Sequence, residues 1–255
     1  MVKQKGKEMV MDRKISVSNW SSEEEEYSNL RNEILNKTSP RDVSNAPFVY
    51  STRQSLTTAL TRIDLFRKVL DVQGAIVECG VHKGNSLFLY NHLSTILEPY
   101  NFNRKIIGFD TFEGFRSLSN SQDDNSLSED DFSDVSFDHL SEMAELEAKN
   151  RAVSHISKIE LVKGDATVTI PEYVEKNPHL IIALLYLDFD IYNPTKIALE
   201  TLLPLVPKGG VVGLDEVNCK KWFGETIALK ETVSLGSISL KKFIYSPWES
   251  YFIVE

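Results

Sequence analysis

One short apolar segment constrains the fold of this chain more than any other. Residues 181–190 read I-I-A-L-L-Y-L-D-F-D, so aliphatic side chains and one tyrosine are followed at once by two carboxylates. An apolar run of this length is typical of a central strand that is buried on both faces of a parallel sheet. Ligands of open α/β sheets bind just outside the carboxyl ends of the strands. We therefore expect Asp188 and Asp190 at a ligand-binding edge.

Strand-like and helix-like segments alternate over most of the chain, which predicts an α/β fold with a doubly wound parallel sheet. The C-terminal pattern differs, because two strand-like segments flank S-P-W-E and predict a terminal antiparallel hairpin. Expected strands are 75–78, 105–110, 159–163, 181–188 and 210–214, followed by the hairpin strands 240–245 and 250–254; expected helices are 51–72, 85–97, 170–176 and 194–205.

Two segments stand outside this alternation. Residues 1–50 are expected to form an N-terminal arm with a partly ordered helical segment, and the polar stretch 1–25 is expected to be mobile. Residues 51–255 form the main domain. Within it, an insertion at about 116–157, rich in Ser, Asp and Glu, separates the second and third strands, and its second half, 137–148, has some helical character. Such long insertions are commonly lids, so a substrate lid is expected, with an inert surface insertion as the alternative.

Composition excludes several classes of function. A chain of 255 residues has room for one α/β domain, and its net charge of −9 argues against a nucleic-acid backbone as the main partner. No run of about 18 apolar residues is present and the N-terminus lacks the apolar segment of a secretory signal, so no membrane helix is expected. Cys79 and Cys219 make no disulfide framework, which indicates a reducing cytoplasm.

A glycine-containing turn follows the first strand, where residues 77–86 read V-E-C-G-V-H-K-G-N-S. Gly80 and Gly84 would permit a tight turn and close approach of a ligand, yet neither the dinucleotide fingerprint nor the Walker pattern is met. Glu78 could meet an ammonium group. The next two strands end in Asp110 and Asp165, placed to accept bonds from ribose hydroxyls and an adenine amino group. A ligand with these parts and no pyrophosphate is S-adenosylmethionine.

A second group of acids points to a metal ion. Asp215 and Glu216 follow the strand expected at 210–214, as Asp188 and Asp190 follow the strand before it. Two neighbouring strands that each deliver a carboxylate pair to one edge suggest a divalent cation and a reacting hydroxyl. Oxygen ligands suit Mg²⁺ better than Zn²⁺, and no Cys/His cluster is present.

Four ordered motifs carry a resemblance to a known family. V-E-C-G-V-H-K-G, G-F-D-T-F-E-G-F, L-D-F-D-I-Y-N-P-T and P-K-G-G-V-V-G-L-D-E resemble the macrocin O-methyltransferase family over roughly residues 50–230. The resemblance implies a class I, Rossmann-like methyltransferase with a seven-stranded sheet whose last strand is antiparallel. It also implies S-adenosylmethionine as methyl donor, Mg²⁺ as the ion that holds sugar hydroxyls, and a role in antibiotic biosynthesis.

The resemblance also assigns roles by position. Asp188, Asp215 and Glu216 are the implied metal ligands, and either Asp190 or His139, in the lid, is the implied base. Glu216 departs from the aspartate usual in the family and could ligate the ion or leave it. Residues expected to contact the cofactor are Glu78, Gly80, Gly84, Ser86, Asp110, Thr111, Phe112, Asp165, Ala166 and Asp188.

The leading hypothesis is a Mg²⁺-dependent O-methyltransferase for a sugar hydroxyl of a glycosylated natural product or glycan intermediate. The expected partners are a small glycoside or sugar substrate and a second copy of the chain, in a homodimer or higher oligomer. A metal-independent O- or N-methyltransferase acting on an amino sugar or another small metabolite is the main alternative. A non-catalytic relative is disfavoured by the intact acids, and an oxidoreductase by the absent dinucleotide fingerprint.

Overall fold

Residues 21–255 are described by a computed structural model of the chain, which divides into two units, Met1–Arg53 and Gln54–Glu255. In the first unit α1 (Ser22–Leu35) is followed by α2 (Pro40–Asn45) and α3 (Pro47–Tyr50). The side chain of Ser21 accepts from the Glu24 amide and Glu24 reaches back to the Ser21 amide, which is a capping box. Residues 22–25, which end the stretch expected to be mobile, form the first turn of α1, and residues 1–20 lie outside the described part.

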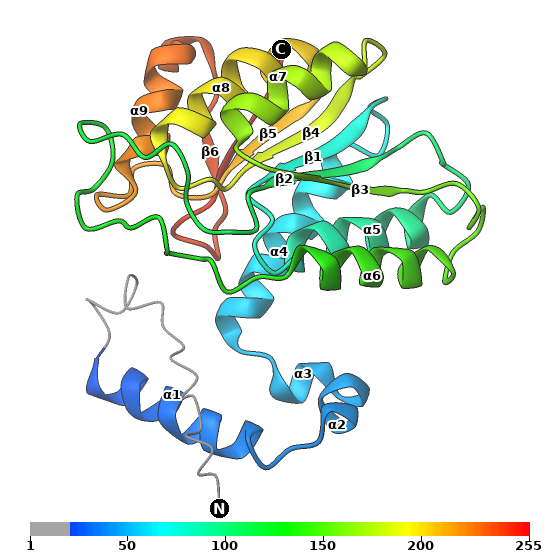
Figure 1. Cartoon of the computed structure of the whole chain (residues 1–255), viewed down its shortest axis with the longest axis vertical. Helices are drawn as coiled ribbons and strands as arrows, with labels where there is room; N and C mark the ends of the chain where they lie inside the picture. The colour runs from blue at the N-terminus through cyan, green and yellow to red at the C-terminus, as the bar shows by residue number, and fades with distance from the viewer. Residues whose placement is uncertain (1–20) are drawn as a thin grey trace, which may run out of the picture. The chain divides into compact units, whose positions relative to one another are not determined.

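The second unit contains a seven-stranded sheet in the order β3-β2-β1-β4-β5-β7-β6 (Figure 1). The pairs among β1 to β5 are parallel, whereas β7 runs antiparallel to both β5 and β6. The predicted α/β fold with a parallel sheet and an antiparallel last strand is confirmed. The strands are β1 (Ala75–Cys79), β2 (Ile106–Asp110), β3 (Ile159–Lys163), β4 (Ile182–Leu187), β5 (Val211–Leu214), β6 (Lys241–Lys242) and β7 (Ser250–Ile253).

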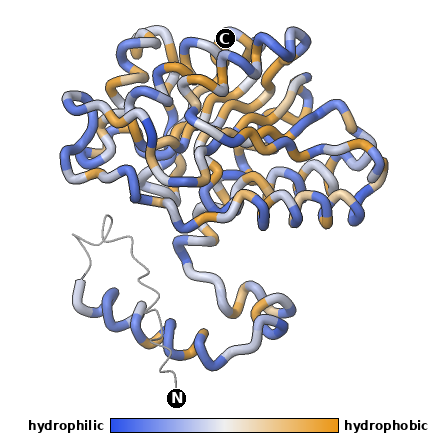
Figure 2. The backbone as a smooth tube through the Cα atoms, in the orientation of Figure 1, coloured by the Kyte–Doolittle hydropathy of each residue, from blue (hydrophilic) through white to orange (hydrophobic). Residues whose placement is uncertain are grey.

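Helices cover both faces of this sheet (Figure 1). On one face lie α4 (Arg53–Lys68), α5 (Asn85–Leu97) and α6 (Phe137–Ala148), and on the other lie α7 (Ala166–Lys176), α8 (Tyr192–Leu202) and α9 (Phe223–Thr232). Short 3₁₀ turns are formed by Leu203–Leu205 and Leu235–Ser237. Hydrophobic residues are concentrated along the central strands (Figure 2), where two apolar clusters pack on opposite faces of the sheet.

Strand β4 is the buried centre of the sheet, as its apolar run predicts. All six of its residues are buried, and it pairs with β1 on one side and β5 on the other. In this register Cys79, Leu187 and Leu214 are neighbours at the carboxyl ends of three adjacent strands. The residues that come next, Asp188 and Asp215, therefore leave the sheet side by side.

Three helices differ from their expected bounds, and one of them, α8, spans Tyr192–Leu202 where 194–205 was expected. Helix α7 begins at Ala166, four residues before the expected start, because the side chain of Asp165 caps it by accepting from the Thr167 amide. Helix α4 ends at Lys68, and its buried residues are Thr61, Arg62, Leu65 and Phe66. None of the helices within residues 21–255 is both long and apolar enough to cross a membrane.

The insertion between β2 and β3 is irregular up to Ser136 and then forms α6, over the residues with the expected helical character. Asp123 holds the irregular part in place: its buried carboxylate accepts from the amides of Ser119 and Tyr192 at 2.7 and 2.8 Å. A Cβ on Gly224 would lie 2.2 Å from the same carboxylate, so α9 packs directly against this loop.

Candidate active site

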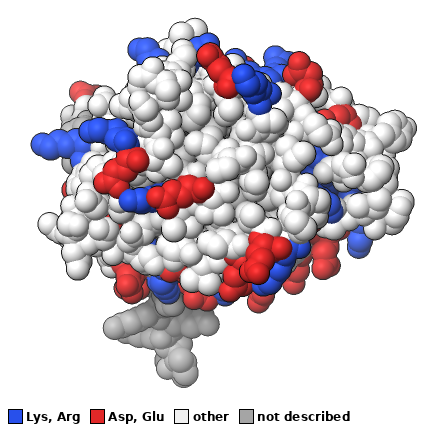
Figure 3. Space-filling model, turned by 90° about the horizontal axis from the view of Figure 1, so that it is seen from above, with Lys and Arg blue, Asp and Glu red and all other residues white. Residues whose placement is uncertain are grey.

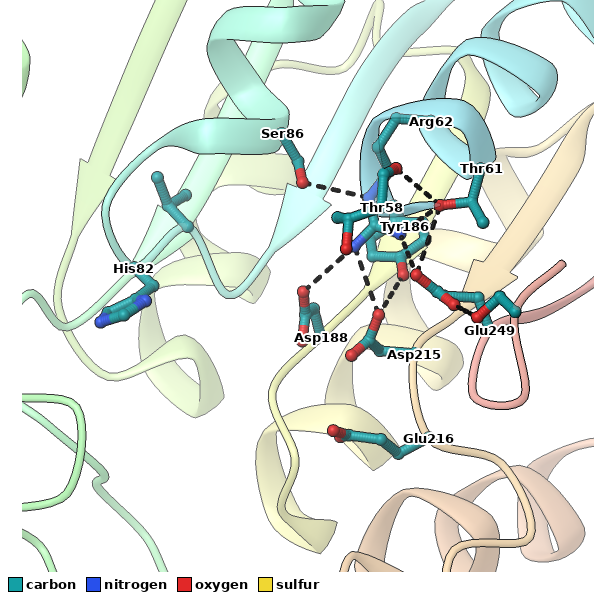
Figure 4. Close-up of polar contacts among 12 residues, drawn as sticks. Thr58, Thr61, Arg62, His82, Ser86, Tyr186, Asp188, Asp215, Glu216 and Glu249 are labelled. Carbon is teal, nitrogen blue, oxygen red and sulfur yellow. Dashed lines mark hydrogen bonds and ion pairs between the residues drawn. The ribbon is translucent and has the colours of Figure 1, made fainter. Parts of the chain in front are cut away.

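Three carboxylates meet at the carboxyl edge of the sheet. Asp188 follows β4, and Asp215 and Glu216 follow β5. One oxygen from each of the three lies within 4.8 Å of the others, so they could hold one metal ion, and Figure 4 shows them on the same side of the sheet edge. The structure therefore brings together the three acids that the sequence predicts as metal ligands. We call them the acid cluster.

A buried arginine from α4 contacts this cluster and was not anticipated from the sequence. Arg62 is 2% exposed, and one of its terminal nitrogens lies 3.5 Å from Asp188 Oδ2 and 3.2 Å from Asp215 Oδ1 (Figure 4). Its guanidinium carbon lies 3.8 Å from the ring centroid of Tyr186. The hydroxyl of Tyr186 donates to Asp215 Oδ1 at 2.5 Å. One signal was present: Arg62 precedes Leu65 and Phe66 by three and four residues, on the buried face of the helix.

The site contains more acid than one arginine balances. Burial, followed by the charges of Asp215 and Asp190, raises the pKa of Asp188. Burial also raises the pKa of Glu216, together with Asp190, with which it shares a side-chain hydrogen bond. Glu225 on α9 is fully buried behind them, where its Oε1 accepts from the Glu216 amide at 3.2 Å and its Oε2 has no partner. Such a concentration of carboxylates favours a cation at this edge.

Glu78 marks the other end of the site. It is 1% exposed, and its Oε2 accepts no hydrogen bond within the described part of the chain. Burial raises its pKa to about 8, against the opposing charge of Arg62. The hydroxyl of Tyr90, on α5, is a second buried group for which no hydrogen-bond partner is found among the described residues. A buried carboxylate oxygen with no partner fits the ammonium group of a ligand.

The glycine turn has the positive φ angles that a tight turn requires, +94° at Gly80 and +80° at Gly84. The close approach at each glycine is to protein atoms. A Cβ on Gly80 would lie 2.0 Å from the carbonyl oxygen of Asp188, and one on Gly84 would lie 3.0 Å from side-chain atoms of Phe88 and Leu140. Gly80 therefore lets the turn lie against the first residue of the acid cluster.

The two acids expected at the ribose and the adenine also brace the backbone. Asp110 accepts from the amides of Val81 and His82 at 2.7 and 2.8 Å, which fixes the glycine turn to the end of β2. Asp165 accepts from Thr167 and from the Ser117 hydroxyl; although burial acts in the other direction, these hydrogen bonds lower its pKa. Both carboxylates are held rigidly at the edge where the cofactor is expected.

The remaining residues predicted to contact the cofactor lie after β2, after β3 and at the start of α5. Thr111 donates its hydroxyl to the carbonyl of Gly114, and Phe112 is buried with φ +55°. Ala166 is the buried first residue of α7, and Ser86 lies in the first turn of α5. These residues follow β2 and β3, or begin the helix after the glycine turn, as expected for cofactor contacts.

The two candidate bases lie in different surroundings. Asp190, with φ +66°, follows β4 and is hydrogen-bonded to Glu216. His139 is exposed in the first turn of α6, where its amide donates to Ser136, and no contact found among the described residues joins it to the acid cluster. Geometry therefore favours Asp190 over His139.

An aromatic group lies where the insertion meets the loop after β5. Trp222 is 8% exposed, and its ring contacts those of Phe115 and Phe132, each at a centroid distance of 6.3 Å. Phe132 also contacts the ring of His82, in the glycine turn, at a centroid distance of 5.4 Å.

On the face formed by α7, α8 and α9, acidic and basic side chains are interspersed, with no extended basic patch (Figure 3).

The strand order, the antiparallel last strand and the glycine turn beside β4 define a class I methyltransferase fold. More particularly, the chain belongs to the macrocin O-methyltransferase (TylF) family, whose sequence profile matches residues 7–229. The family resemblance seen in the four motifs is thereby confirmed, and the chain is an S-adenosylmethionine-dependent methyltransferase.

Solved structures agree with this assignment. The chain is similar to CalS11, calicheamicin methyltransferase, with a TM-score of 0.85 and 33% identity over 92% of this chain and 93% of that one. The apo structure of CalS11, described as a TDP-rhamnose 3′-O-methyltransferase of calicheamicin biosynthesis, matches with a TM-score of 0.79 and 32% identity over 92% and 95%. The O-methyltransferase NovP shares the fold, with a TM-score of 0.59 and 17% identity over 77% and 79%. No curated protein matches the sequence significantly.

Proposed function

We propose that this chain is a Mg²⁺-dependent O-methyltransferase that acts on a sugar hydroxyl of a glycosylated natural product or of its sugar precursor. The similarity to CalS11 extends over nearly the whole of both chains and supports a sugar as acceptor. The observation that carries the proposal is the acid cluster, which places three carboxylates within 4.8 Å of one another beside the partnerless oxygen of Glu78.

The donor set fits Mg²⁺. Only oxygen ligands are offered, and Asp188 and Asp215 keep 28% and 20% of their side-chain surface exposed, which leaves room for water or a substrate hydroxyl. Asp188, Asp215 and Glu216 would hold the ion. When bound, Mg²⁺ supplies positive charge that orients the acceptor hydroxyl and lowers its pKa.

The residues of the chain perform the remaining work. Glu78 would accept hydrogen bonds from the ammonium group of S-adenosylmethionine, and Asp110 from its ribose hydroxyls. The bound cofactor would supply an electrophilic methyl group, which passes to the acceptor oxygen while the electrons of the broken carbon–sulfur bond stay on sulfur. Asp190 takes the hydroxyl proton as general base. The aromatic group around Trp222 walls the acceptor side.

The experiment that tests this function is methyl transfer to TDP-rhamnose and a panel of nucleotide-linked and glycoside sugars, with and without EDTA. We expect transfer to a sugar hydroxyl that EDTA abolishes and added Mg²⁺ restores. Asp188→Ala should lose activity while still binding S-adenosylhomocysteine in calorimetry. Asp71→Ala, which removes an exposed carboxylate before β1, is the matched control and should behave as wild type. Full activity in excess EDTA would contradict the metal requirement.

One observation favours a second candidate, a metal-independent O- or N-methyltransferase. Arg62 already places a positive charge against Asp188 and Asp215, as a metal ion would. In that case the acids would orient an amine or a hydroxyl without an ion. Undiminished transfer in EDTA, above all to an amino sugar, would select this alternative.

We also infer that the chain forms a homodimer or a higher homo-oligomer and that the insertion at about 116–157 acts as a lid. Three apolar side chains of the N-terminal unit, Ile34, Phe48 and Val49, are 61%, 80% and 75% exposed, which supports their burial against a second copy. Light scattering after size-exclusion chromatography should give a multiple of the 28.9 kDa chain mass, and Phe48→Ser should shift it towards the monomer.

A further inference from the structure

The buried guanidinium of Arg62 contacts residues on both the cofactor side and the acid-cluster side of the site. Its side chain is 2% exposed, so every donor of the guanidinium must find an acceptor within the protein. Nε donates to Ser86 Oγ at 3.1 Å. One terminal nitrogen donates to Thr61 Oγ1 at 3.1 Å and to Glu249 Oε1 at 3.4 Å, and the other contacts Asp188 and Asp215.

Apart from Thr61, which lies on α4 beside Arg62 itself, these acceptors belong to four other segments of the chain. Ser86 lies in the first turn of α5 and hydrogen-bonds Glu78, at the cofactor end. Asp188 and Asp215 follow β4 and β5, at the metal end, whereas Glu249 precedes β7. Figure 4 shows the guanidinium between Ser86 on one side and the two aspartates on the other. A single rigid group therefore touches both ends of the site.

We propose that Arg62 is the positioning residue that couples the cofactor pocket to the acid cluster, holding Ser86 on one side and the carboxylates of Asp188 and Asp215 on the other. This inference rests on the proposed Mg²⁺ site. Arg62 contacts Oδ2 of Asp188 and Oδ1 of Asp215, and no hydrogen bond from the described residues reaches the second oxygen of either carboxylate. The arginine thus fixes one oxygen of each acid and leaves the other for the ion.

Charge supports the same assignment. When all three acids are ionised, Arg62, which also pairs with Glu249, offsets at most one of their charges, and the acid cluster keeps a net charge of at least −2. A divalent cation balances that charge. Without the arginine the site would carry an additional buried negative charge, and the two aspartates would lose the contact that separates and orients them.

Arginine is required here for its shape as well as its charge. The planar guanidinium stacks on Tyr186 and directs fixed donors to Ser86, Asp188 and Asp215 at once. A lysine ammonium is a single compact charge that cannot reach both ends of the site together. Arg62→Lys therefore keeps the charge and removes the geometry.

The test measures binding of Mn²⁺, as a paramagnetic substitute for Mg²⁺, by electron paramagnetic resonance, and binding of S-adenosylhomocysteine by calorimetry. We expect Arg62→Lys to weaken Mn²⁺ binding by about 10- to 100-fold, the usual cost of losing a residue that holds metal ligands. S-adenosylhomocysteine should also bind more weakly to this variant in the absence of metal, because Ser86 is released.

Arg104→Lys is the matched control. Arg104 is equally buried, at 3% exposure, but it binds Glu98 and the carbonyls of Val69, Val72 and Gly74, away from the acid cluster. This variant should change neither affinity. Circular dichroism establishes that each variant is folded.

Ser86→Ala provides a second measurement that does not disturb a buried charge. It removes one contact of Arg62 and touches none of the three acids, so weaker Mn²⁺ binding by this variant supports coupling through the guanidinium. If folded Arg62→Lys binds Mn²⁺ as tightly as wild type or more tightly, the inference is overturned; if Arg62→Lys does not fold, unchanged Mn²⁺ binding by Ser86→Ala overturns it. Absence of Mn²⁺ binding by wild type would overturn the proposed Mg²⁺ site as well.

Discussion

Replacing Gly80 by alanine should destabilise the enzyme even when no ligand is bound. The new Cβ would lie 2.0 Å from the carbonyl oxygen of Asp188 and 2.6 Å from its carbonyl carbon, and φ at this position is +94°. A side chain in such a backbone conformation costs about 1–3 kcal/mol. Overpacking against backbone that cannot rotate away costs about 1–3 kcal/mol more. We expect a total loss of about 2–6 kcal/mol, which lowers Tm by roughly 4–24 °C for a chain of this size.

Thermal unfolding of the cofactor-free protein measures this loss. The matched control is Gly236→Ala, because no atom lies within 4 Å of the added Cβ and the backbone is not in the left-handed region. The control should change the free energy of unfolding by less than about 0.5 kcal/mol. Because the Gly80 clash is with Asp188 itself, Gly80→Ala should also weaken Mn²⁺ binding.

The opposite result would refute the packing argument. If Gly80 is needed only to let a ligand approach the turn, Gly80→Ala will have the same Tm as Gly236→Ala. Its only defect will then be weaker binding of S-adenosylhomocysteine. The two explanations thus predict different changes in the protein without ligand.

Three further predictions concern the acids and the insertion. Burial raises the folded-state pKa of Glu78 to about 8, so the folded state binds more protons than the unfolded state from roughly pH 4.5 to 8. The free energy of unfolding should therefore fall as pH rises through this window, by at most about 1.4 kcal/mol per pH unit. In cofactor-free urea titrations Glu78→Gln should flatten this decline, and an unchanged slope would contradict the assignment. Asp190→Asn should lower kcat by about 100-fold or more, whereas His139→Asn should leave kcat near wild type; the reverse order would identify His139 as the base. Gly224→Ala should push Asp123 from its place, where the new Cβ would lie 2.2 Å from the carboxylate, and speed hydrogen exchange in residues 116–136; unaltered exchange would show that Asp123 does not anchor the insertion.

Apolar runs and strand-end acids made the centre of the fold predictable. A parallel sheet places the carboxyl ends of its strands at one edge, so the runs ending in Asp188 and Asp215 sufficed to predict that these acids meet. The bounds of β3, α5 and α6 agree with the sequence to the residue. These elements are determined by the apolar and polar residues within each segment, and that pattern can be seen directly in the sequence.

The errors arose where a local pattern admitted two readings. The run S-S-E-E-E-E has the composition of a mobile arm, yet Ser21 and Glu24 form a capping box that starts α1. The helix expected at 170–176 omitted four residues, because the capping of α7 by Asp165, which starts the helix at Ala166, was not recognised in the sequence. Arg62 was missed because its partners are 24, 126 and 153 residues away in the sequence.

The acid cluster and its arginine together support the proposed dependence of the site on a cation. Parallel strands bring Asp188 and Asp215 together, and Glu216, Asp190 and Glu225 add three more carboxylates nearby. Each negative charge makes it more costly to bury the other carboxylates in their ionised form. Arg62 offsets only one of these charges. Protonation could neutralise the remainder, but a protonated acid would be a poor metal ligand and a poor general base. In the proposed mechanism a divalent ion held by these acids would instead stabilise their ionised form, and would so keep Asp190 charged as the acceptor of the hydroxyl proton.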